Sequence, residues 1–256
     1  MSEVFRAEIL DPLKARSQWP QSWLGIPYSE IQPRVLEMGR ADFRVGFSHP
    51  TYGTISAVDK VALYCFMNMR SHYYASLATF RAFDLSAALS RDEPTLFVDL
   101  GCGPGTSGLA FADHLDGSYI FDYHPLDLAQ PMLDRAALLF AAAKGRAVGN
   151  GSIGNITGGG TTHRHVIFNA SYLFSSDTLD VTWIVDLVRL AKANADVVIF
   201  VYTNSIDPRA GQKWQQFCSA IGLADHATQD TVQYRNSSYD PNGKSVTFMR
   251  AVLRVK

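Results

Sequence analysis

The glycine-rich stretch LFVDLGCGPGTSGLAFAD, residues 96–113, constrains the fold of this chain more than any other segment. Its first apolar residues are typical of the end of a buried strand, and its last ones have the apolar spacing of a helix. Between them lie Gly101, Gly103 and Gly105, which carry no β-carbon that would keep a ligand away from the backbone. A strand, a glycine turn and a helix N-terminus in this order predict a nucleotide-type site.

Strand-like and helix-like segments alternate from about residue 93 onward. Strands are expected in 95–100, 122–128, 165–174 and 196–202, and helices in 106–115, 131–144, 179–194 and 211–223. Two further strand-like segments, 231–238 and 245–255, flank the turn sequence Asp240-Pro241-Asn242-Gly243. The pattern predicts a Rossmann-like α/β fold: a mainly parallel sheet, covered on both faces, with a C-terminal antiparallel hairpin.

The first 90 residues lack this alternation and predict a separate, mostly helical cap, so we expect a cap over 1–90 and a ligand-binding domain over 91–256. Residues 57–83 are apolar enough to form one or two helices that fold back over the glycine turn. Arg70, His72, Tyr73 and Tyr74 would then reach a ligand. The alternative is a helical support on the outer face of the sheet.

Two common nucleotide patterns do not fit the turn. The dinucleotide pattern G-x-G-x-x-G requires a third glycine where Thr106 stands, and the chain has no G-x-x-x-x-G-K-[ST] phosphate loop. The string D-L-G-C-G-P-G-T instead resembles motif I of the class I S-adenosylmethionine-dependent methyltransferases. This resemblance implies that family's Rossmann-like fold, S-adenosylmethionine as cofactor and methyl transfer as activity.

The resemblance also implies roles for individual residues. Gly101, Cys102, Gly103 and Gly105 would lie beside the methionine arm of the cofactor, and the Asp99 carboxylate would bind its ammonium group. The alternative role for Asp99 is to close the loop by hydrogen bonds to backbone amides.

A second acidic residue, Asp127, ends the next expected strand and lies about 20 residues after Gly105, the spacing of a ribose-binding acid. Asp122 stands too early and is expected to open that strand. Leu128 and Met132 would line the adenine side, with Met132 equally suited to the helix core. The acid with which the family contacts adenine has no clear counterpart among Asn150, Ser152, Ile153 and Asn155.

The methyl acceptor is expected after the fourth strand, where Asn169 and Ala170 would border the cofactor. Tyr172 and His165 are the candidate catalytic residues, although Tyr172 could equally be a packing residue. The [DNS]-P-P-[YFW] signature of amino-group methylation and a Pro-Cys dipeptide for attack on cytosine are both absent there. The histidines show no spacing of metal ligands, so no metal site is expected.

The net charge of the chain limits which classes of methyl acceptor are expected. A formal net charge of −1 does not favour nucleic acid as substrate, but a local basic patch would suffice for RNA.

The three cysteines form no disulfide framework, and neither a secretory signal nor a membrane-spanning run is evident, so a cytoplasmic protein is expected. Residues 62–83 and 171–174 loosely resemble the ribosomal small-subunit methyltransferase-like family. The expected acceptor is therefore a small molecule, RNA or protein, and the alternative function is a non-catalytic cofactor-binding module that signals to a partner protein.

Overall fold

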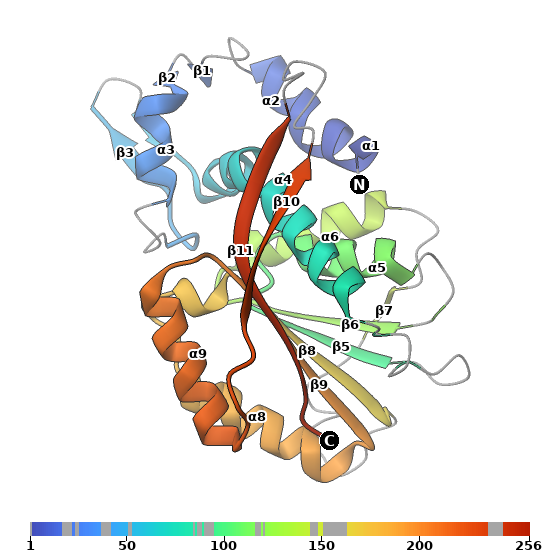
Figure 1. Cartoon of the computed structure of the whole chain (residues 1–256). Helices are drawn as coiled ribbons and strands as arrows, with labels where there is room; N and C mark the ends of the chain where they lie inside the picture. Colours follow the sequence, from blue (N-terminus) through green and yellow to red (C-terminus); the bar gives the residue numbers. More distant parts are fainter. Residues whose placement is uncertain are drawn as a thin grey trace.

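The computed structural model of this chain has one seven-stranded sheet in the order β10-β11-β9-β8-β5-β6-β7 (Figure 1). It describes residues 2–16, 22–23, 26–36, 42–50, 53–83, 85, 89, 95–115, 119, 121–143, 148–150, 163–234 and 243–256. The strands are β5 (Thr95–Leu100), β6 (Phe121–Leu126), β7 (Val148–Asn150), β8 (His165–Ser171), β9 (Val197–Asn204), β10 (Thr228–Tyr234) and β11 (Lys244–Arg254). Strands β5 to β9 pair in parallel, whereas β11 pairs antiparallel with both β9 and β10.

The expected Rossmann-like fold with a C-terminal antiparallel hairpin is confirmed. The order of the strands reverses between β5 and β8, because β5 continues to β6 on one side and neighbours β8 on the other. In an open α/β sheet a ligand binds outside the carboxyl ends of the strands at such a switch point. The glycine turn that follows β5 stands at this position.

Helices cover both faces of the sheet. Apolar residues of α8 (Val181–Asn194) and α9 (Pro208–Ile221) pack on one face, and those of α4 (Ala57–Ala82) and α5 (Thr106–Leu115) pack on the other. Helix α6 (Gln130–Ala142) packs against the first half of α4 and the N-terminal segments. Within the described residues, no helix is both long and apolar enough to span a membrane.

The N-terminal segment is largely helical, as expected, but also contains two short hairpins that the sequence did not predict. It comprises α1 (Ser2–Phe5), a π-helical turn (Arg6–Leu10), α2 (Asp11–Arg16), α3 (Tyr28–Leu36) and the strand pairs β1 (Ser22–Trp23) with β2 (Ile26–Pro27) and β3 (Phe47–His49) with β4 (Gly53–Ile55).

Helix α4 joins this segment to the sheet. It is one continuous helix, and the Ser56 hydroxyl caps its start by accepting a hydrogen bond from the Asp59 amide. Its last turns belong to the core of the sheet, where Phe80 lies 5.3 Å from Phe111 and 6.1 Å from Phe97, ring centroid to ring centroid. The expected boundary near residue 90 therefore divides two segments that share one hydrophobic core.

The β10–β11 hairpin extends beyond the carboxyl edge of the sheet (Figure 1). The last residue of β9, Asn204, pairs with Met249, whereas β11 begins at Lys244, which pairs only with Tyr234. Helix α4 contacts both strands of this hairpin. Of the expected turn, residues 240–242 lie outside the described part of the chain, as do residues 151–162 of the glycine-rich segment.

Candidate functional site

The three glycines of the turn all have positive φ angles, 61° for Gly101, 52° for Gly103 and 76° for Gly105. Two of them are packed: a β-carbon on Gly101 would lie 2.7 Å from the Leu173 side chain, and one on Gly105 would lie 2.9 Å from the Phe140 ring. A β-carbon on Gly103 would have no atom of a described residue within 4 Å. The middle glycine therefore faces open space at the switch point of the sheet.

Asp127 lies against this open glycine. It follows the last residue of β6, and its carboxylate accepts hydrogen bonds from the Gly103 amide and the Ala129 amide, both at 2.9 Å. Burial raises the pKa of Asp127, and the amides act in the opposite direction because they favour the ionised form. The two candidate residues are thus adjacent, and the carboxylate fixes the orientation of the glycine turn.

Asp99 lies beneath the turn rather than on its open side. Its buried carboxylate accepts hydrogen bonds from the Tyr123 hydroxyl at 2.9 Å and from the Asn169 amide at 2.7 Å. Burial raises the pKa of Asp99 to about 6, although these hydrogen bonds favour the ionised form. Asp99 therefore links three neighbouring strands, β5, β6 and β8.

The remaining candidates for the cofactor side differ in exposure. Leu128 is 81% exposed beside Asp127, so its apolar side chain is free at the ligand edge. Met132 is buried in the cluster formed by α6 and α4, so it is a core residue here. Ala170 is fully buried in β8, and the Cys102 thiol is buried within the turn.

Tyr172 is the only described non-glycine residue with a positive φ, 59°, and it comes directly after β8. Its ring stacks on the imidazole of His72 from α4, with centroids 3.6 Å apart and an angle of 14° between planes. The Tyr172 hydroxyl is buried and has no hydrogen-bond partner among the described residues. Strained backbone and an unsatisfied polar atom together are typical of functional positions.

The structure places His165, the other catalytic candidate, at the wrong end of the strand. His165 is the first residue of β8 and pairs in register with Val197, whereas the glycine turn follows the opposite ends of the strands. A strand of this length separates the two ends by roughly 20 Å. Nearby, the His163 imidazole is 2.5 Å from the Asp122 carboxylate, and Asp122 is the second residue of β6.

Two residues of α4 that the sequence analysis did not select also face this site. The Tyr64 hydroxyl is 3.2 Å from Nδ1 of His72, and burial together with the charges of Tyr172 and Asp127 raises the pKa of Tyr64. The Asn68 side-chain nitrogen is buried without a partner among the described residues. The spacing 64, 68, 72 places these side chains on one helix face, which is the signal that could have identified them.

Other expected residues are engaged elsewhere or lie outside the described part. The Tyr73 hydroxyl donates to the Asp113 carboxylate of α5, away from the turn. The adenine-side candidates Ser152, Ile153 and Asn155 lie outside the described residues, as does the side chain of Asn150.

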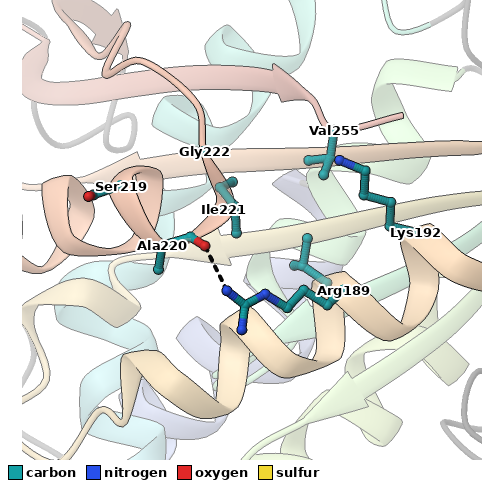
Figure 2. Close-up of a pocket in the computed structure, with 8 residues that line it drawn as sticks. Arg189, Lys192, Ser219, Ala220, Ile221, Gly222 and Val255 are labelled. Carbon is teal, nitrogen blue, oxygen red and sulfur yellow. Dashed lines mark hydrogen bonds between the residues drawn. The ribbon is translucent and has the colours of Figure 1, made fainter.

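Two cavities open at other places on the molecule. One, of about 340 Å³, lies between α8 and the end of α9, where Arg189 donates a hydrogen bond to the Ala220 carbonyl at 2.9 Å (Figure 2). The other, of about 350 Å³, lies between α4 and the β10–β11 hairpin. Among the described residues, no group of three histidine, cysteine or acidic side chains is arranged to hold a metal ion.

Comparison with known proteins gives only distant similarities. No family model matches the chain, and no curated protein matches its sequence. Among solved structures, it is similar to precorrin-6y C5,15-methyltransferase from Geobacter metallireducens (10% identity, 70% of this chain and 85% of that one, TM-score 0.41). It is also similar to a putative O-methyltransferase from Klebsiella pneumoniae (13% identity, 95% and 94%, TM-score 0.38). A third similar structure is a putative methyltransferase from Streptococcus mutans in complex with S-adenosylhomocysteine (14% identity, 65% of this chain and 93% of that one, TM-score 0.39). The function of this chain is therefore inferred from the geometry of the site.

Proposed function

We propose that this chain binds S-adenosylmethionine at residues 101–105 and 127–128 and transfers its methyl group to an acceptor held beside Tyr172. The observation that carries the proposal is the open face of Gly103, in a turn whose other two glycines are packed against side chains. A methionine arm can lie against bare backbone there. Thr106 in place of a third glycine disfavours a dinucleotide.

Asp127 is suited to the ribose of this cofactor. An ionised carboxylate has about four acceptor positions. The Gly103 and Ala129 amides use two of them, and the Leu128 amide acts on the same carboxylate. The remaining capacity can accept a ribose hydroxyl, so a ligand can bind without breaking the contact that orients the turn. The exposed Leu128 side chain next to it offers an apolar surface for adenine.

Asp99 acts from below the turn in this proposal. Its carboxylate is held by Tyr123 and Asn169, so it supplies negative charge beneath the glycine backbone rather than a direct contact. A buried charge acts over a longer distance than an exposed one because less water screens it. It would therefore favour the cofactor's ammonium group.

The residues after β8 and on α4 would align the acceptor. S-adenosylmethionine supplies an electrophilic methyl group on a sulfonium, so the protein mainly has to orient the nucleophile. Burial lowers the pKa of His72 to about 3, which keeps its imidazole neutral at pH 7 and makes it a weak base. We therefore assign His72 and Tyr172 to positioning rather than to proton removal.

Thermal stabilisation by S-adenosylhomocysteine, NAD and ATP at equal concentration tests the cofactor assignment. S-adenosylhomocysteine is expected to raise the melting temperature most, since a ligand stabilises only the fold that binds it. A larger shift with NAD or ATP would contradict the proposal. Release of S-adenosylhomocysteine from S-adenosylmethionine in the presence of candidate acceptors then separates an enzyme from a non-catalytic binding module.

A further inference from the structure

Strand β10 forms one edge of the seven-stranded sheet, and among the described residues it pairs only with β11. Every second residue of such an edge strand directs its N–H and C=O groups away from the neighbouring strand. The Thr231 amide donates to the carboxylate of the preceding residue, Asp230, at 2.7 Å, which indicates that this amide faces away from β11. Gln229 and Gln233 have the same phase, so their backbone groups point outward as well.

This edge lacks the usual protection against another strand. Proteins commonly block an exposed edge with lysine, proline or a charged side chain that cannot be buried. The sequence of β10, TQDTVQY, contains neither lysine nor proline. Its one charged residue, Asp230, is neutralised by the Arg250 guanidinium 2.9 Å away. The backbone of β10 is therefore available to pair with a further strand.

A groove lies beside this edge, between β10 and helix α4 (Figure 1). It has a volume of about 350 Å³, with Leu77, Ala78 and Arg81 of α4 on one side and Asp230 and Val232 of β10 on the other. Side chains of a strand point alternately to the two faces of its sheet. A strand added to β10 would therefore direct every second side chain toward α4 and this groove.

The groove carries one positive charge that the protein itself does not neutralise. Arg250 is bound to Asp230 and also donates to the Ala78 carbonyl at 3.4 Å. Arg81 is exposed at the groove, and within the described part of the chain no carboxylate is paired with it. An acidic side chain is the group that complements this position.

We propose that the β10 edge and the adjoining groove bind an extended, acidic segment of a partner protein, which adds one strand to the sheet. Main-chain hydrogen bonds to β10 would supply affinity, and alternate side chains in the groove would supply specificity. An apolar side chain fits beside Leu77 and Val232, and a carboxylate fits beside Arg81. This inference does not depend on the proposed function, because the groove is separate from the glycine turn.

A second copy of this chain fits the groove less well than a separate acidic segment. Two-fold pairing of β10 with β10 would place both copies of α4 on the same face of the joined sheet, so that their Arg81 side chains would repel. The groove-facing side chains of the second β10 are also already engaged. Its Asp230 is bound to its own Arg250, and its Tyr234 ring stacks on its own Tyr74, with centroids 5.2 Å apart.

The test selects peptides of about eight residues, enough for one strand, from a random display library on the full-length protein. The selected peptides are synthesised and titrated by fluorescence anisotropy into the wild type, Thr231→Pro, Arg81→Glu and a control, Lys192→Glu. Proline at residue 231 removes an amide that faces away from β11, which an edge strand tolerates. Lys192 is exposed on α8, on the opposite face of the sheet, so the control makes the same change of charge. Thermal melting checks the fold of each variant.

We expect the selected peptides to alternate apolar and polar residues and to carry aspartate or glutamate. Thr231→Pro should weaken their binding at least about 10-fold, because main-chain hydrogen bonds are lost. Arg81→Glu should weaken it roughly 5- to 10-fold, since an ion pair becomes a repulsion. Lys192→Glu should bind as the wild type does. N-methylation of a peptide at alternate residues should abolish binding in one phase and not in the other.

Three results would overturn the proposal. The first is that the library yields no peptide, and the second is that the selected peptides bind Thr231→Pro or Arg81→Glu as tightly as the wild type. The third comes from analytical ultracentrifugation of the protein alone. A wild type that sediments as a dimer, together with a monomeric Thr231→Pro, would assign the β10 edge to a second copy of this chain instead.

Discussion

The imidazole of His72 on α4 stacks on the phenol ring of Tyr172 after β8, with ring centroids 3.6 Å apart. This contact joins α4 to the switch point of the sheet, where the order of the strands reverses between β5 and β8. Ser76, one turn further along α4, adds hydroxyl contacts to Ser107 at 3.0 Å and to Ser171 at 3.2 Å. The middle of α4 is therefore positioned against the ligand edge, while its last turns pack on the sheet.

The stacked His72 should make the folded protein less stable as the pH falls. Burial lowers the folded-state pKa of His72 to about 3, below its unfolded value of 6.5, so the native state binds fewer protons between these pH values. Stability should fall by about 2 kcal/mol from pH 6.5 to pH 5 through this group. Chemical denaturation of His72→Phe at several pH values should lack this contribution. The exposed His226→Phe serves as control and should follow the wild type.

Asp99 should change the free energy of unfolding with pH in the opposite direction to His72. Its folded-state pKa of about 6 exceeds the ordinary aspartate pKa of 3.8, so the native state binds more protons between these pH values, and stability falls as pH rises. The full effect is about 3 kcal/mol. Asp99→Asn should remove it, leaving a steeper gain of stability with pH from His72. An unchanged pH profile in Asp99→Asn would contradict the assigned burial of the charge.

The same Asp99→Asn variant tests the electrostatic role below the turn. Its amide can be accommodated if the Asn169 side chain turns over, because the Asn169 oxygen has no partner among the described residues. A folded variant with about 10-fold weaker binding of S-adenosylhomocysteine is expected, since a favourable charge is lost. Unchanged affinity would leave Asp99 with the loop-closing role alone.

Gly103→Val should abolish binding of S-adenosylhomocysteine while the protein still folds. The new side chain would fill the open face of the turn, and the positive φ adds a strain of about 1–2 kcal/mol. Gly222→Val is a matched control, because Gly222 also has a positive φ, 75°, and open space around its α-carbon, at the end of α9. Circular dichroism and calorimetry on both variants would show similar stability, and lost binding only at Gly103.

Hydrogen exchange should reveal the two halves of α4. Residues 60–72 should exchange more slowly when S-adenosylhomocysteine binds, because that half adjoins the ligand edge. Residues 76–82 should not respond, since Phe80 already lies in the core of the sheet. For the same reason, removal of residues 1–90 should prevent folding as well as activity. Exchange rates in residues 60–72 that are unaffected by the ligand would show that α4 is only a support.

The sequence predicted the parts of the site that are local in the chain. The glycine turn, the strand before it and Asp127 follow from a short string and a spacing, and they lie together as expected. The fold followed from the alternation of apolar segments. The position of α4 could be expected only in outline, because its contacts with β8 and the hairpin join residues far apart in sequence.

His165 shows where such reasoning fails. It lies only seven residues from Tyr172, but a strand separates the two, and the apolar pattern does not tell which end of the strand meets a ligand. Tyr64 and Asn68 were missed for a different reason. Within an apolar helix their spacing is visible, but the neighbour they face is set by the tertiary packing of α4.

Calorimetric titration of S-adenosylhomocysteine into the wild type, Asp127→Asn and Asp134→Asn is the decisive test of the cofactor site at the glycine turn and Asp127. Asp134 lies on α6, where, among the described residues, its carboxylate accepts only an exposed hydrogen bond from Gln130, so its variant matches the change of charge. We expect binding to the wild type, the same affinity in Asp134→Asn and a loss of ~10- to 100-fold in a folded Asp127→Asn. Equal affinity in all three proteins would contradict this expectation.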